Sequence, residues 1–174
     1  VVEDGRMSDK TTYTMVEDDL SQLLEDVDGE SDFPFDFNLI QENLKGMDRG
    51  NLGIIFARPE VGKTTFCSFL LSSYLKRKFK VVYWANEEPA RKIKLRVIQS
   101  YFEITTEEMI RNKDQLVERY RNEIAPYLKI ADSVGTSIEE VDEYAKLNKP
   151  DVMFCDQLDK FRIGGQYNRG DERL

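Results

Sequence analysis

The feature that most constrains the fold of this chain is the triplet Gly62-Lys63-Thr64. It stands between an apolar run, residues 52–57, and a stretch at residues 64–78 whose apolar side chains recur at helical spacing. Glycine, lysine and a hydroxyl residue where a strand meets a helix are typical of a phosphate-binding loop, because the N–H groups of a helix N-terminus attract an anion. A chance triplet at a helix start would not explain both flanking segments. The sequence therefore predicts a strand, a phosphate loop and a helix, in that order.

The predicted loop departs from the general phosphate-loop pattern at its first position. That pattern begins with glycine, whereas this loop begins with Ala57. A methyl group is tolerated there if φ stays negative, and Pro59 fixes the backbone of the turn. We expect Lys63 to reach the β and γ oxygens of a nucleotide and the Thr64 hydroxyl to bind Mg²⁺. The predicted loop residues are Ala57, Arg58, Pro59, Glu60, Val61, Gly62, Lys63, Thr64 and Thr65.

Strands and helices are expected to alternate after the loop. Further strands are predicted at residues 80–85, 127–132 and 150–156, and further helices at residues 89–102, 105–124 and 138–148. Thr136 and Glu139 have the spacing of a capping box before the last helix. This alternation predicts an α/β fold with a mostly parallel sheet and helices on both faces.

Acidic residues follow two of the predicted strands. Ligands in such sheets bind at the carboxyl ends of strands, so Asp156 is predicted to hold Mg²⁺ together with Thr64. The alternative for Asp156 is a turn or cap residue. Glu87 and Glu88 follow residues 80–85, and Glu87, which is nearer the strand, is the candidate general base for the attacking water. The alternative is that both acids stabilise the N-terminus of the next helix, which suits Glu88.

The N-terminal arm differs in composition from the rest of the chain. Residues 1–32 hold eleven acidic and two basic residues, a net charge of −9, whereas the remainder has a net charge of +1, which together give the chain its net charge of −8. Residues 14–27 have the pattern of a short amphipathic helix, which docks either on another surface or on its own domain. We expect an acidic hinge to follow, then a short helix at residues 37–45. The predicted domains are the arm, residues 1–32, and an ATPase-like body, residues 33–174.

Composition excludes some classes of protein. An acidic chain lacks the broad basic surface of a protein that binds nucleic acid by itself, which leaves open an assembled channel in which a few basic loops meet a strand. Cys67 and Cys155 lie in apolar runs without metal-ligand spacing, so we expect reduced core thiols. With no apolar run of membrane-spanning length and no leader pattern, the chain is predicted to be soluble and cytoplasmic, with no membrane partner. Both ends look like cuts, which indicates a fragment of a longer protein.

Four motifs in order give the sequence a family resemblance. They read ARPEVGKTTF from Ala57, VVYWANEEP from Val81, DVMFCDQLDKF from Asp151 and NRGDERL from Asn168. Together they resemble the RecA-like motor domain of DnaB-type replicative helicases, including phage helicases and primase-helicases, over about residues 33–174. The resemblance selects Glu87 over Glu88 as the catalytic glutamate. It matches Asp156 to the Walker B acid and Arg96 to an arginine of the following helix.

The resemblance implies a RecA-like P-loop NTPase that uses ATP and Mg²⁺ to move along single-stranded DNA and to unwind a duplex during replication. It implies a homo-oligomeric ring, usually a hexamer, with ATP between subunits and an arginine supplied by the neighbour. The helix at residues 15–27 falls where the family has a linker helix that docks on the next subunit. Primase or other replication proteins are implied as partners, in a bacterial or phage-infected cell.

Two other functions stay open at this point. One is a RecA-like recombinase or another ATPase that forms rings or filaments without unwinding DNA. The other is a non-catalytic nucleotide-binding fragment or interaction module. The family's sensor strand, DNA-gripping loops and arginine finger would all lie beyond Leu174.

Overall fold

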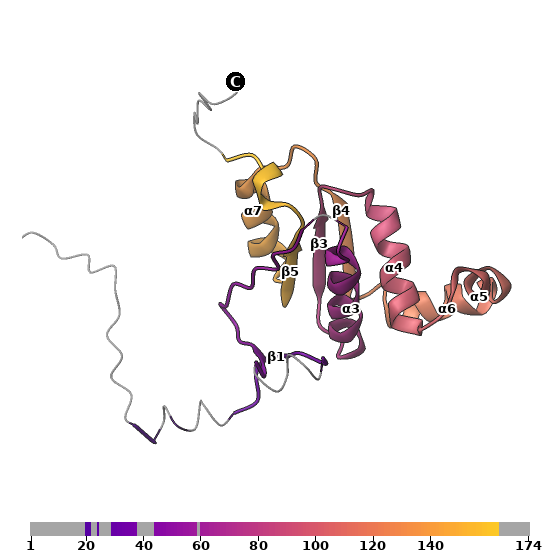
Figure 1. The fold of residues 1–174 in the computed structure, drawn as a ribbon, viewed down its shortest axis with the longest axis horizontal. Helices are drawn as coiled ribbons and strands as arrows, with labels where there is room; N and C mark the ends of the chain where they lie inside the picture. The colour runs from indigo at the N-terminus through magenta and orange to yellow at the C-terminus, as the bar shows by residue number, and fades with distance from the viewer. Residues whose placement is uncertain (1–19, 22–23, 25–28, 38–43, 59, 164–174) are drawn as a thin grey trace, which may run out of the picture.

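A parallel three-stranded sheet forms the centre of the protein. The structure, a computed structural model, describes residues 20–21, 24, 29–37, 44–58 and 60–163. The strands are β3 (Val81–Ala85), β4 (Leu128–Asp132) and β5 (Val152–Cys155), in the spatial order β4-β3-β5. Val81 pairs with both Leu128 and Val152, so the strands start in register. All three carboxyl ends therefore lie at one edge of the sheet (Figure 1).

Helices cover both faces of this sheet, as the alternation predicted. The helices α3 (Lys63–Lys76) and α4 (Ala90–Phe102) pack on one face, and α7 (Ile138–Asn148) packs on the other (Figure 1). The short helices α5 (Thr106–Arg111) and α6 (Lys113–Glu123) lie beyond α4, and a 3₁₀ turn, η1 (Leu158–Lys160), follows β5. Among the described residues, no helix has the length and apolarity to cross a membrane.

The main core lies between the sheet and α3 with α4. All five residues of β3 are buried, as expected for a central strand covered on both faces. Its partners from the two helices include four side chains with no exposed surface: Leu71, Leu75, Ile93 and Val97. A smaller cluster under α7 joins Val82 and Trp84 to Val141 and Phe161. The apolar sequence pattern thus places β3, and the residues that follow it, at the centre of the molecule.

A small hairpin attaches the N-terminal part of the body to the end of α3. Its strands, β1 (Phe33–Pro34) and β2 (Gly46–Met47), pair antiparallel. A Cβ atom on Gly46 would lie 2.5 Å from the Phe33 carbonyl oxygen, so only glycine fits. The Phe33 ring packs edge-on against Tyr74 and Phe79.

The prediction of a strand at residues 52–57 is wrong. Residues 51–58 have no regular secondary structure, and Leu52, Ile54 and Phe56 are 81%, 73% and 96% exposed. An extended segment becomes a strand only when a neighbouring backbone pairs with its N–H and C=O groups. Among the described strands, β5 pairs with β3 alone. No described strand pairs with residues 52–57, so the apolar run does not form the predicted strand.

Two predicted helix boundaries also differ. The helix expected at residues 105–124 is divided at Asn112, a residue type whose side chain competes with helical backbone hydrogen bonds. The capping box before α7 is formed by Ser137 and Glu140 in place of Thr136 and Glu139. A parallel bridge between Ser137 and Arg162, in which the Arg162 N–H donates to the Thr136 carbonyl, keeps the backbone extended for one more residue.

The N-terminal predictions fall largely outside the described residues. Leu20, Ser21 and Leu24 of the predicted helix at residues 14–27 are helical, and the two leucines are 71% and 58% exposed. In the helix predicted at residues 37–45, the described residues Phe37, Leu44 and Lys45 are not helical, and residues 38–43 lie outside the description.

Candidate functional site

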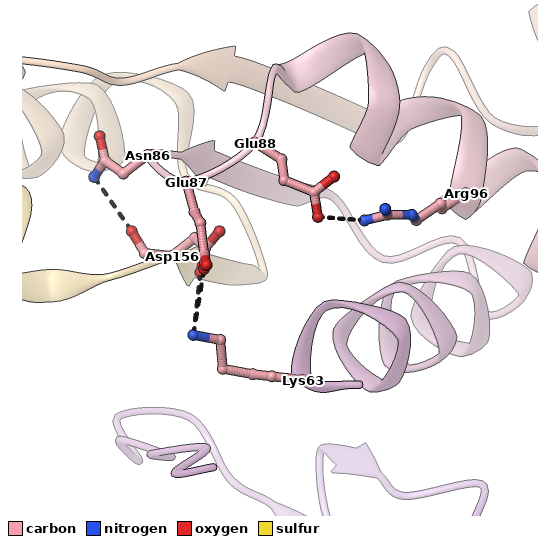
Figure 2. A network of polar contacts seen from close by, with 6 residues as sticks. All are labelled: Lys63, Asn86, Glu87, Glu88, Arg96 and Asp156. Carbon is pink, nitrogen blue, oxygen red and sulfur yellow. Dashed lines mark hydrogen bonds and ion pairs between the residues drawn. The ribbon is translucent and has the colours of Figure 1, made fainter. Parts of the chain in front are cut away.

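Three side chains that the sequence singled out meet at the carboxyl edge of the sheet. Lys63 begins α3, Glu87 follows β3 and Asp156 follows β5. The Lys63 ammonium lies 3.5 Å from the Glu87 carboxylate and 4.0 Å from the Asp156 carboxylate. Figure 2 shows the lysine reaching from the helix toward both acids. The arrangement places one cation between two carboxylates at the mouth of the phosphate loop.

The loop that leads into α3 has the backbone geometry of an anion site. Gly62 precedes the helix with φ of 94°, and open space surrounds the position of a Cβ, so glycine is needed there for its conformation. Glu60 also has a positive φ, whereas Ala57 does not. No side chain caps the N-terminus of α3, and its first turn has no acidic residue. Its first N–H groups are therefore available to phosphate oxygens.

The other predicted loop residues differ in exposure. Ala57 and Thr64 are half-buried, and Pro59 lies outside the described residues. The exposed members are Arg58, Glu60, Val61 and Thr65. Thr64 directly follows Lys63 in the first turn of α3. It therefore lies at the same edge of the sheet as the three charged side chains.

Asp156 has the surroundings of a metal ligand. The residue is 8% exposed, and its Oδ2 is buried without a hydrogen-bond partner. Burial raises the pKa of this carboxyl, the Lys63 charge opposes that shift, and the Glu87 charge adds to it. A buried carboxylate oxygen that has no hydrogen-bond partner is suited to binding a cation, whose positive charge offsets the cost of burying the carboxylate.

Mg²⁺ would fit this position without a cage of protein side chains. Among the residues that the structure describes, no three His, Cys, Asp or Glu side chains could hold a metal together. Mg²⁺ keeps several water ligands and is bound through one or two carboxylates plus substrate phosphates. Asp156 and the Thr64 hydroxyl are the side chains of this chain that would hold it.

Glu87 and Glu88 point to different partners (Figure 2). Glu88 accepts a 2.6 Å hydrogen bond from Arg96 of α4, which lowers the pKa of the Glu88 carboxyl. Glu87 faces Lys63 and is 44% exposed at its side chain, so water reaches it. The ion pair fixes Glu88 to the helix and leaves Glu87 beside the loop.

Sequence reasoning missed two polar residues that hold the Glu87 segment. Asn86 is 7% exposed, and its Nδ2 donates to the Asp156 main-chain carbonyl at 3.2 Å. Asp132, at the end of β4, accepts a 2.7 Å hydrogen bond from the Ala90 N–H at the start of α4. Asn86 lies within the motif VVYWANEEP, and Asp132 ends the strand predicted at residues 127–132. Each bond nevertheless joins segments far apart in the chain, so only the register of the paired strands shows which groups these side chains meet.

The two cysteines are free thiols with different surroundings. Cys67 is buried on α3, one turn after Lys63, and burial together with the Asp156 charge raises the pKa of its thiol to about 11. Cys155 is half-buried at the end of β5, and burial raises the pKa of its thiol too. In both residues burial favours the thiol over the nucleophilic thiolate.

Comparison with known proteins gives one match. The family model described as the DnaB-like helicase C-terminal domain matches residues 33–172. No curated protein and no solved structure matches the chain. The match covers the sheet, the loop and all of the site residues above.

Proposed function

The chain belongs to the DnaB-like helicase C-terminal domain family, and from that premise we propose that it is the ATP-hydrolysing part of a replicative DNA helicase. Membership of the family confirms the resemblance and the RecA-like α/β fold class expected from the sequence. The observation that carries the proposal is the meeting of Lys63, Glu87 and Asp156 beside an uncapped helix N-terminus.

Each of the three side chains has a role that its position supports. Lys63 would exchange its two carboxylate contacts for β and γ phosphate oxygens, and the α3 N–H groups would hold the same phosphates. Glu87, which is exposed to water, would take the proton of the attacking water. Asp156 and Thr64 would hold Mg²⁺, which neutralises charge that develops on the phosphates.

The activity of the whole protein is proposed on the same basis. We expect a homo-oligomeric ring, usually six subunits, that encloses single-stranded DNA, with a neighbour's arginine completing each ATP site. The exposed Leu20 and Leu24 suit a helix that docks on an adjacent subunit. Primase and other replication proteins are the proposed further partners, in the cytoplasm of a bacterial or phage-infected cell.

The first test is a Lys63→Ala variant of the intact protein. Without the ammonium, DNA-stimulated ATP hydrolysis and unwinding of a tailed duplex should fall to background while the near-ultraviolet circular dichroism stays unchanged. Lys113→Ala, an exposed lysine at the start of α6, is the matched control and should behave as the unsubstituted protein does.

Retained ATPase activity in the Lys63→Ala variant would contradict the assigned site. Activity that depends on Lys63 but never unwinds a tailed duplex would favour the recombinase or filament alternative. No ATPase activity in the unsubstituted intact protein would favour a non-catalytic module.

A further inference from the structure

The short segment that carries Glu87 is held by side-chain hydrogen bonds to both neighbouring strands. On one side, the Asn86 amide donates to the carbonyl of Asp156, which follows β5 (Figure 2). On the other side, Asp132 at the end of β4 accepts from the Ala90 N–H. The segment between β3 and α4 is therefore fixed at both of its ends.

The Asn86 bond takes the place of a rung of the sheet. The last backbone bond between β3 and β5 runs from the Asp156 N–H to the Trp84 carbonyl at 3.0 Å. In a parallel ladder the next rung would join the backbone N–H of Asn86 to the carbonyl of Asp156. The side-chain amide of Asn86 makes that bond instead. The backbone can thus turn out of the sheet toward the loop while the two strand ends stay tied together.

Stability alone does not account for an amide at this position. Asn86 is nearly buried, yet its Oδ1 has no hydrogen-bond partner. A buried acceptor without a partner is unfavourable, and an apolar side chain of similar size, such as leucine, would avoid that cost. The side chain also makes no contact with the Lys63 ammonium, because it points to the main chain of Asp156 (Figure 2).

We propose that Asn86 is a positioning residue for ATP hydrolysis, which fixes Glu87 relative to Asp156. This inference rests on the proposed ATPase function. The general base and the metal ligand come from different strands, and both must stand at set places around one phosphate. A misplacement of about 1 Å in such a site costs on the order of a hundredfold in rate. The Asn86 bond lies one rung beyond the backbone bond from Asp156 to Trp84, so it is the described hydrogen bond that ties the residue next to Glu87 to Asp156.

The test compares Asn86→Asp, which keeps the shape but removes the donor, with Asn86→Leu, which removes both polar atoms. In the intact protein, kcat for ATP hydrolysis should fall by about ten- to a hundredfold in both variants. In Asn86→Leu, which adds no charge, KM for ATP and the affinity for a non-hydrolysable ATP analogue should stay within about twofold, because the phosphate loop is untouched. Asn86→Gln, which restores an amide donor, should recover part of the lost rate.

Asn148→Leu is the control for loss of an amide donor at an exposed position. Its Nδ2 also donates to a main-chain carbonyl, that of Tyr144 at 3.0 Å, but on α7 away from the site. The variant should leave kcat unchanged. If Asn86→Leu keeps normal kcat, or loses melting temperature and nucleotide affinity as much as rate, the positioning role is wrong. The ATPase activity of the unsubstituted protein is measured before that of any variant. Its absence would overturn the proposed function and this inference together, whereas a normal rate in the variants would overturn this inference alone.

Discussion

Replacing Asp132 should show how much α4 depends on a cap from outside its own sequence. The residue before α4 is Pro89, which has no side-chain oxygen, and the helix has no side-chain cap and no acidic residue in its first turn. Two basic residues, Arg91 and Lys92, stand there instead, where the helix dipole disfavours them. The carboxylate of Asp132 supplies the missing acceptor, and it adds a negative charge at a helix end where Glu88 is already paired with Arg96.

The expected cost follows from those two contributions. Loss of a capping acceptor costs about 0.5–2 kcal/mol, and loss of a negative charge near a helix N-terminus costs about 0.3–1 kcal/mol. Ala90 is 9% exposed, so water does not readily replace the lost acceptor. We therefore expect Asp132→Ala to lower the free energy of unfolding by about 2 kcal/mol. Asp132→Asn keeps an oxygen acceptor and should lower it by about 0.5 kcal/mol.

Urea denaturation followed by far-ultraviolet circular dichroism measures both differences. The slope of free energy against urea should be equal in the three proteins, so that midpoints compare directly. An Asp132→Ala protein within about 0.5 kcal/mol of the unsubstituted one would show that the bond contributes little. Equal losses in the alanine and asparagine variants would show that charge, and not the hydrogen bond, is responsible.

Two further outcomes are expected. Glu87→Gln should bind ATP normally but hydrolyse it about a hundredfold or more slowly in a steady-state assay, since a positioned general base contributes roughly that much; near-normal turnover would move the base to Glu88 or elsewhere. The Arg77 guanidinium, and then the Ser73 hydroxyl, hold the pKa of Asp36 below its ordinary value, so this carboxylate stabilises the fold above the pKa of the unfolded chain. That contribution should disappear as pH falls through the lowered pKa, and Asp36→Asn should show a flatter dependence of unfolding free energy on pH; equal slopes would contradict this.

The positions of the candidate site residues could be predicted from the order of the elements, as could the α/β fold class. Lys63, Glu87 and Asp156 each follow or begin an element whose apolar pattern is clear, and parallel strands bring such ends together without any further information. The position of Glu87 nearer the strand end favoured it over Glu88 as the candidate base, and the resemblance selected the same residue. The structure adds a physical reason, because Arg96 holds Glu88.

The errors arose where distant segments decide the local structure. Apolar residues 52–57 predict extended backbone, but pairing depends on a partner strand that composition does not reveal. Thr136 and Ser137 both have a glutamate three residues later, and the bridge to Arg162 decides between them. Asn86 precedes two glutamates that are the more obvious catalytic candidates. Its proposed positioning role can be inferred only when the structure shows that the Asp156 carbonyl lies across the sheet from it.

The exposed apolar segment at residues 52–56 affects the solubility of the chain in concentrated solution. Its five residues carry no charge and no proline, and the described part of β5 has backbone groups on one side that no strand pairs with. Such a combination is a template for contact between chains, because an apolar segment of one molecule can pair with the open strand edge of another. The acidic arm works in the opposite direction by mutual repulsion. We therefore expect the exposed apolar segment to lower the solubility of the chain and the acidic arm to raise it. Added salt screens the charges of the arm, so it should promote precipitation.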